Sequence, residues 1–215
     1  MPVYHNPLDV RSRLARHGVD YDDIVEAVLR GHATRSLGNE LHPSNYKGNL
    51  FHANTVEGLR DILLSQAGWE MDEPKNLSIT FNHGEDVCIV VASGNNKTGN
   101  PYKDPKTRSK KGAFLEAAVA QNTGEIPQRE LFETEAEYLE RVAKIEAKQA
   151  ALSSKNVFYL LIHSNDGVPV AELSRPIAID DGWVTAWKER YILDLTIPRG
   201  GDADDDEFDI PVTMK

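Results

Sequence analysis

The chain has few of the features that define several classes of protein. Cys88 is the single cysteine among 215 residues, so no disulfide can form within the chain, and a reducing, cytoplasmic compartment is expected. No apolar run approaches the roughly 20 residues that cross a bilayer. The segment from Met1 to Asp9 also lacks the apolar core of a secretory signal. We therefore expect neither a membrane partner nor a disulfide-stabilised secreted scaffold.

Sequence motifs of several common enzymes are absent as well. The chain has no Gly-x-x-x-x-Gly-Lys-Ser/Thr phosphate loop, no Gly-x-Gly-x-x-Gly dinucleotide fingerprint and no Gly-x-Ser-x-Gly nucleophile elbow. None of the seven histidines has the short ligand spacing of a zinc site, so no metal is expected. Cys88 lies in an apolar run, where a thiol is typically an inert small hydrophobe.

What is present is the composition of an ordinary globular protein. Hydrophobic residues make up 40% of the chain and charged residues 27%. At roughly 100–200 residues per domain, the length predicts one globular domain over 1–199. An acidic C-terminal tail over 200–215 follows it. The tail is interpreted as a mimic of nucleic-acid phosphates, as a lid over the basic segment 94–112, or as a solvated chain end.

The net charge of -10 conceals a block of the opposite sign. Residues 94–112, the basic loop, contain glycines and prolines but no apolar period, and their cations are Lys97, Lys103, Lys106, Arg108, Lys110 and Lys111. One interpretation is contact between the last five of these and the phosphates of a nucleotide or nucleic acid, with Tyr102 stacking on a base. The other is a solvated surface loop.

The hydrophobic pattern predicts helices and strands in alternating groups. Helical patterns cover 8–30, 54–68, 113–120 and 135–152. Segments typical of strands cover 50–52, 77–81, 87–92, 157–162, 168–173, 177–179 and 191–197. Turn residues at 82–84 and 165–167 favour hairpins between the strands that flank them. The predicted fold class is α+β, with a mostly antiparallel sheet, N-terminal helices and a helical insertion.

His52 is the most distinctive candidate site residue. It is predicted to end a short strand, Leu50-Phe51-His52, directly before a helix in which Asn54 and Glu57 have capping-box spacing. A side chain in that place lies beside a helix N-terminus, whose partial positive charge favours phosphates. The alternative interpretation is a histidine that only caps its local backbone.

This segment resembles the opening of the ADP-ribosyltransferase superfamily, in which a strand carrying His or Arg leads into a helix that ends near a Gly. Residues 77–81, Leu-Ser-Ile-Thr-Phe, resemble the Ser-containing second strand of that family. Glu189 lies roughly where a late catalytic Glu would be. The family's Glu-x-Glu or Gln-x-Glu motif reads Trp187-Lys188-Glu189 here, and Glu172 is an equally placeable carboxylate.

The resemblance implies an ADP-ribosyltransferase-like fold, with NAD as the cofactor used to modify a protein or nucleic acid. It implies that His52 hydrogen-bonds NAD and that Ser78 or Thr80 supports the nicotinamide pocket. Glu189 would be the catalytic residue, binding a ribose hydroxyl and stabilising the positive charge of the transition state. We therefore expect these side chains to converge on one cleft.

Two other classes of function remain open. The first is a non-enzymatic, acidic interaction or inhibitor protein of the kind that phages or mobile elements encode, which blocks a nucleic-acid enzyme. The second is a nucleic-acid-binding protein that uses the basic loop over 97–111.

Overall fold

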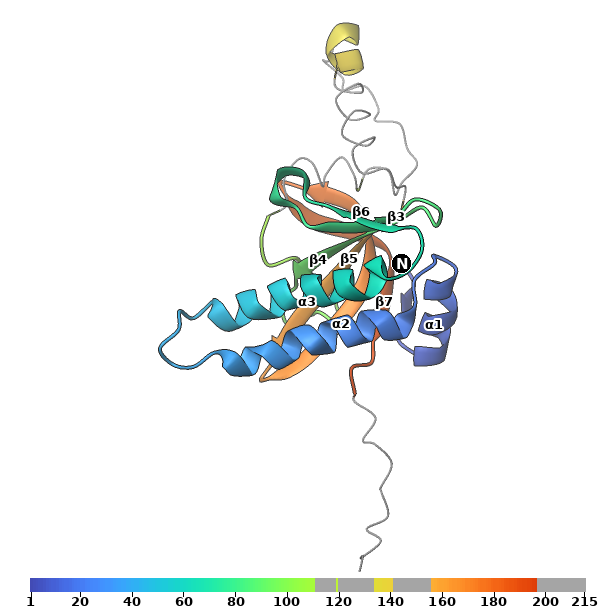
Figure 1. Ribbon diagram of the computed structural model, residues 1–215. Coiled ribbons are helices and arrows are strands. Elements are labelled where there is room, and N and C mark those ends of the chain that lie inside the picture. Colours follow the sequence, from blue (N-terminus) through green and yellow to red (C-terminus); the bar gives the residue numbers. More distant parts are fainter. Residues whose placement is uncertain (111–118, 120–133, 141–155, 197–215) are drawn as a thin grey trace, which may run out of the picture.

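The computed structural model describes residues 1–110, 119, 134–140 and 156–196, in which helices cover one face of a sheet (Figure 1). Within these residues the sheet has seven strands in the order β1-β7-β6-β5-β4-β3-β2. Its strands are β1 Val3–Tyr4, β2 Trp69–Asp72, β3 Ile79–Asn82, β4 Val87–Ser93, β5 Asn156–Asn165, β6 Val168–Asp180 and β7 Trp183–Leu193. The β4–β5 and β1–β7 pairs are parallel and the others antiparallel. The predicted α+β class with a mostly antiparallel sheet is confirmed.

Local sequence signals produce two hairpins. Between β3 and β4, the side chain of Asn82 accepts hydrogen bonds from the amides of Gly84 and Glu85. Between β5 and β6, Asp166 and Gly167 have φ values of 47° and 88°, the left-handed conformation that a tight hairpin turn requires. Both predicted hairpins are confirmed. The strand predicted at 177–179 is a continuation of β6, and the strand predicted from residue 191 is the end of β7.

The N-terminal helices are α1 Pro7–Ala15, α2 Tyr21–Ala33, the 3-10 helix η1 Thr34–Leu37 and α3 Tyr46–Leu64. Figure 1 shows α2 and α3 running side by side across the sheet. The prediction of one helix over 8–30 is wrong, because Gly18 with φ 66° ends the first helix. Asp20 then caps α2 by accepting a hydrogen bond from the amide of Asp22 at 2.7 Å.

The short strand predicted at 50–52 is also wrong, because these residues lie inside α3. Phe51, Thr55, Leu59 and Leu63 are buried at a spacing of four residues, which is the period of a helix face. The short segment Leu50-Phe51-His52 fits either structure, and the helix prevails because it buries this stripe on the sheet. Strand β2 was missed because it is an edge strand whose residues after Trp69 are exposed.

The sheet separates two hydrophobic clusters, since successive strand residues point to opposite faces. The cluster under the helices includes Ile24, Val28, Leu59, Ile89, Phe158 and Leu160. The cluster on the other face includes Phe81, Cys88, Val90, Tyr159 and Trp187. Cys88 is fully buried there, and this burial raises the pKa of its thiol to about 12. Such a thiol is protonated near neutral pH, as expected of a structural cysteine.

The predicted helices over 113–120 and 135–152 lie largely outside the described residues, and the acidic tail lies entirely outside them. In the described segment 134–140, Thr134 and Glu137 form the predicted capping box. The Thr134 amide donates to Glu137 Oε2 at 2.9 Å, and the Glu137 amide donates to Thr134 Oγ1 at 3.3 Å. Among the described helices, none has both the length and the apolar character needed to span a bilayer.

Candidate functional site

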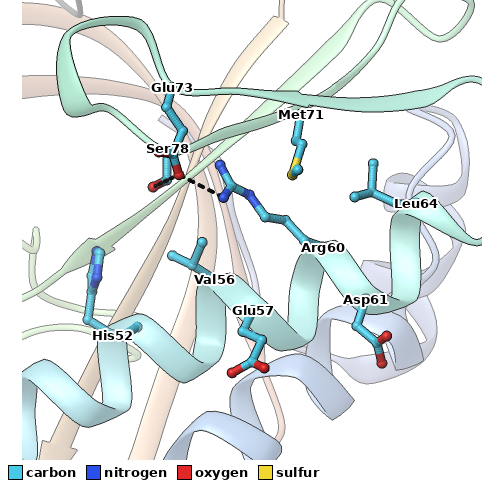
Figure 2. A pocket seen from close by; sticks show the side chains of 10 residues that line it. His52, Val56, Glu57, Arg60, Asp61, Leu64, Met71, Glu73 and Ser78 are labelled. Atoms are coloured by element: carbon cyan, nitrogen blue, oxygen red, sulfur yellow. Dashed lines mark hydrogen bonds and ion pairs between the residues drawn. The ribbon is translucent and has the colours of Figure 1, made fainter.

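His52 lies in the middle of α3 with its ring turned toward β4. Its Nε2 is 3.2 Å from the carbonyl oxygen of Val91. His52 and Ser78 both line a groove of about 700 Å³ between α3 and the segment from β2 to β3 (Figure 2). Thr80 is buried in β3 opposite Ile89, on the helix-covered side of the sheet. The structure therefore brings His52 and Ser78 together and places Thr80 on the same side of the sheet.

The charges of this groove do not suit a phosphate. Arg60 donates to Glu73 at 2.8 Å, as Figure 2 shows, and this hydrogen bond holds the pKa of Glu73 below its ordinary value. Ser78 donates a long hydrogen bond to the same carboxylate at 3.4 Å. Glu57 and Asp61 also line the groove. Arg60 is already paired with Glu73 and Asp61 is paired with Arg30 at 2.8 Å, so among the described lining residues the groove offers an anion no unpaired lysine or arginine.

Glu189 lies in β7 and does not line the groove. Its carboxylate is 3.7 Å from the guanidinium of Arg175, and the two side chains are only 17% and 12% exposed. It also hydrogen-bonds Tyr191, whose pKa is raised by burial and, second, by this contact. The groove thus unites His52 and Ser78 without Glu189. The ADP-ribosyltransferase resemblance stays a prediction, and its opening strand is replaced by a helix.

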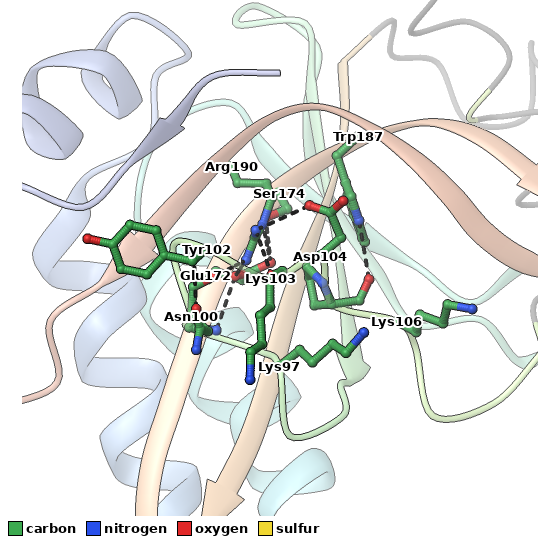
Figure 3. A network of polar contacts seen from close by, with 12 residues as sticks. Lys97, Asn100, Tyr102, Lys103, Asp104, Lys106, Glu172, Ser174, Trp187 and Arg190 are labelled. Carbon is green, nitrogen blue, oxygen red and sulfur yellow. Dashed lines mark hydrogen bonds and ion pairs between the residues drawn. The ribbon is translucent and has the colours of Figure 1, made fainter.

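Glu172, the alternative carboxylate, lies on the opposite face of the sheet in a fully buried pair with Arg190 (Figure 3). Arg190 donates from Nη2 to Glu172 Oε2 at 2.5 Å and from Nε to Oε1 at 3.1 Å. The Ser174 hydroxyl and the Gly99 amide donate to the same carboxylate at 3.0 and 3.1 Å. A buried charge is tolerated only when it is paired and hydrogen-bonded in this way. Both carboxylate oxygens of Glu172 are thus engaged in contacts that hold the folded structure together.

The same network fastens the basic loop to the sheet. Arg190 donates from Nη1 to the carbonyl of Lys103 at 3.0 Å and from Nη2 to the carbonyl of Asn100 at 3.1 Å. The indole N–H of Trp187 donates to the carbonyl of Pro105 at 3.3 Å. A backbone bridge joins Gly94 to Thr107 at the base of the loop. Over 94–110, the predicted loop is therefore a folded platform with fixed backbone positions.

The platform presents several of its predicted cations to solvent. Lys97, Lys103 and Lys106 are exposed, and within the described part of the chain they form no ion pair. Figure 3 shows their side chains extending away from the buried network. Lys110 is paired with Asp181 at 2.6 Å. Lys111 lies outside the described residues.

Arg108, the remaining cation of the loop, lines a polar cavity of about 370 Å³ that we call the basic pocket. Arg35 from η1 and Lys47 from the first turn of α3 line it too. The ends of the parallel strands β4 and β5 complete the wall with Ser93 and Ser164. No carboxylate of the described residues lines the pocket. Three cationic residues thus line one cavity in a chain whose net charge is -10.

Neutral donors add to the positive potential of the basic pocket. The first helical hydrogen bond of α3 runs from the Asn49 amide to the Asn45 carbonyl. The amides of Lys47 and Gly48 find no acceptor in the described chain, and the Asn45 side chain does not cap them. Ser164 Oγ is buried and also lacks a partner there. Free amides at a helix N-terminus, together with an unpaired hydroxyl, favour an anion.

Sequence reasoning identified only one of the three cations of the basic pocket. Arg108 belongs to the predicted basic loop, whereas Arg35 and Lys47 lie in a polar stretch without any charge cluster. The available signal was a lysine, and no acid, in the first turn of α3, where acidic residues are favoured. The incorrect strand at 50–52 concealed this signal, because it placed the start of the helix too late.

No group of three potential metal ligands occurs in the described portion of the chain. Comparisons with known protein families, with curated proteins and with solved structures find no match to this chain. The functional conclusion therefore depends on the chemistry of the basic pocket itself.

Proposed function

We propose that the protein binds a phosphate-bearing ligand, a nucleotide or a nucleic acid, in the basic pocket. One observation carries this proposal: Arg35, Lys47 and Arg108 come from three separate chain segments and line one cavity that contains no carboxylate of the described residues. Cations brought together in this way repel one another unless an anion compensates them. Arginine binds phosphate oxygens through a planar fork, and lysine acts as a compact point charge.

The position and size of the basic pocket support the same conclusion. The pocket lies where the parallel strands β4 and β5 end and where α3 begins. Open sheets with parallel strands commonly bind ligands outside the carboxyl ends of those strands, and helix N-termini stabilise phosphates. Its volume of about 370 Å³ is within the range of small-molecule sites.

NAD, the cofactor that the sequence resemblance implies, is a special case of this ligand chemistry because it contains a pyrophosphate. The groove with His52 and Ser78 lacks the proposed catalytic Glu189, so the proposal concerns binding and not transfer of ADP-ribose. NAD is accordingly one of the probes that test the proposal.

The test is a thermal-unfolding and calorimetric titration with inorganic phosphate, thymidine monophosphate and NAD. We expect stabilisation of about 2.7 kcal/mol at about 100 times the dissociation constant of the best probe. Arg108→Gln and Lys47→Gln are expected to weaken binding about tenfold each. Lys188→Gln, at an exposed residue of β7 outside the pocket, removes the same charge and is the matched control.

Three results would decide against the proposal. The first is the absence of stabilisation by all three probes. The second is an equal loss of affinity in Arg108→Gln and Lys188→Gln, which would indicate an effect of net charge only. The third is stabilisation by NAD alone that His52→Ala abolishes, which would favour the groove and the ADP-ribosyltransferase interpretation.

A further inference from the structure

We propose that the ligand of the basic pocket is a single-stranded nucleic acid whose backbone continues from the pocket across the basic loop. This inference rests on the proposed function and specifies that the phosphate-bearing ligand is a polymer. The strand would follow Arg108, Lys106, Lys97 and Lys103, and Tyr102 would stack on one of its bases. The geometry of the loop, the free charges on it and the exposed ring each support this path.

The loop leads from the pocket, at the ends of β4 and β5, to the opposite face of the sheet, where Arg190 and Trp187 hold its backbone. Thr107 is buried and bridged to Gly94, so Lys106 and Arg108 on either side of it both face outward. The side-chain oxygen of Asn95 accepts from the amides of both Lys97 and Lys106, at 3.1 and 3.3 Å. This shared acceptor holds Lys97 beside Lys106. The pocket cation Arg108 is therefore the first member of a row.

The charges along this row are available to a ligand. Lys97, Lys103 and Lys106 make no ion pair with any described residue, whereas the neighbouring Lys110 is neutralised by Asp181. Asp104 is the single acid between 94 and 110, and it lies 3.7 Å from the buried Arg190. A row of unpaired cations matches a regularly charged polymer better than a single nucleotide, which would fill the pocket and leave the lysines unused.

Tyr102 supplies the contact that a base requires. Its side chain is 91% exposed, so it makes little contribution to the packing of this chain. In Figure 3 the side chains follow one another across the view from Lys106 through Lys97 and Lys103 to Tyr102. Stacking on an exposed aromatic ring needs a base that is free of its own stack, which indicates a single strand and not a duplex.

The buried network beneath the row fixes its shape before any ligand binds. Arg190 holds the carbonyls of Asn100 and Lys103 on either side of Tyr102, and Trp187 holds the carbonyl of Pro105 next to Lys106. A platform that is already ordered loses less conformational freedom on binding, and this retains affinity. A loop that is only solvated does not require a fully buried ion pair to hold its backbone in position.

The experiment measures binding of fluorescent oligothymidylates of about 4 and about 12 nucleotides by anisotropy, beside calorimetry with thymidine monophosphate. We expect affinity to increase with length. In K97Q/K103Q/K106Q, the affinity for the longer strand should decrease about tenfold or more, and the slope of log K against log salt should decrease by about 2. Binding of thymidine monophosphate should be unchanged in this variant. Tyr102→Ala should lose about tenfold, and Tyr102→Phe should bind like the original protein.

The outcomes separate this inference from the proposed function. Two results would refute a polymeric ligand while leaving the proposed phosphate site intact. One is a long strand that binds no tighter than the monophosphate, and the other is normal binding of the long strand by K97Q/K103Q/K106Q. A duplex that binds as tightly as the strand refutes the single-strand assignment. If oligonucleotide binding survives Arg108→Gln and Lys47→Gln but is lost in K97Q/K103Q/K106Q, the basic pocket is not part of the oligonucleotide site. Absence of binding by every probe refutes both proposals.

Discussion

The buried pair of Glu172 and Arg190 gives the sharpest stability prediction. Glu172→Gln keeps the size of the side chain but removes the negative charge opposite a fully buried guanidinium. Removal of one partner from a buried pair costs about 3–5 kcal/mol, because the remaining charge is left uncompensated. At about 2–4 °C per kcal/mol for a chain of this size, we expect the melting temperature to decrease by about 6–20 °C.

Asp104→Asn is the matched control for this substitution. Asp104 Oδ1 is 3.7 Å from Nη1 of the same arginine, but its side chain is 74% exposed. The charge change is identical, whereas the surrounding solvent screens the interaction. The expected loss is therefore below about 1 kcal/mol.

Urea unfolding followed by tryptophan fluorescence and circular dichroism measures both variants. The slope with denaturant has to be unchanged for the comparison to hold, since a changed slope would mean a different denatured state. A loss in Glu172→Gln below about 1 kcal/mol, or equal to that of Asp104→Asn, would refute the reasoning. The loop carbonyls that Arg190 contacts would then be sufficient to compensate its charge.

Three further predictions concern the core. Gly31→Ala should lower the free energy of unfolding, measured by calorimetry, by about 1–3 kcal/mol or more, because the new Cβ would lie 2.2 Å from Thr55 Oγ1. Gly58→Ala is the control and should change the stability little, because the nearest atom to its new Cβ lies at 3.4 Å. Equal losses would contradict the close helix crossing at Gly31. Because burial raises the pKa of Cys88 to about 12 from an ordinary 9.0, native protein near pH 8 should resist iodoacetamide until urea unfolds it, and rapid native labelling would contradict this. The pKa of the Cys88 thiol is higher in the folded than in the unfolded protein, so the stabilisation linked to the protonated thiol is complete below the unfolded pKa and decreases as pH rises toward 12. Over that range, the urea midpoint of Cys88→Ala should therefore decline less than that of the original protein.

The groove and the basic pocket differ chiefly in charge. The larger groove contains Arg60, but that arginine is paired with Glu73 and accompanied by further carboxylates. The smaller basic pocket contains cations without any carboxylate of the described chain. In a protein of net charge -10, an anion is attracted only where the local potential opposes the overall one. This contrast favours the basic pocket over the groove for a phosphate, despite its smaller volume.

Short-range features were the ones that the sequence predicted well. The hairpins of β3–β4 and β5–β6, the capping box at Thr134 and the extent of the basic loop from residue 94 depend on neighbouring residues. The start of α3 was misplaced because Leu50-Phe51-His52 fits a strand as well as a helix in isolation. Burial of the Phe51, Leu59 and Leu63 stripe against the sheet resolves that ambiguity, and burial is a property of the whole fold.

By itself, the sequence determined the α+β class, the turns, the inert cysteine and the accumulation of positive charge between 94 and 112, since periodicity, turn chemistry and charge act over a few residues. Only the tertiary structure decided that Arg35 and Lys47 join Arg108 in one pocket, that Glu172 is neutralised by Arg190, and that Glu189 does not line the groove of His52. These contacts join residues far apart in the chain. They follow from strand order and from the face on which each side chain lies, and local sequence patterns do not encode either.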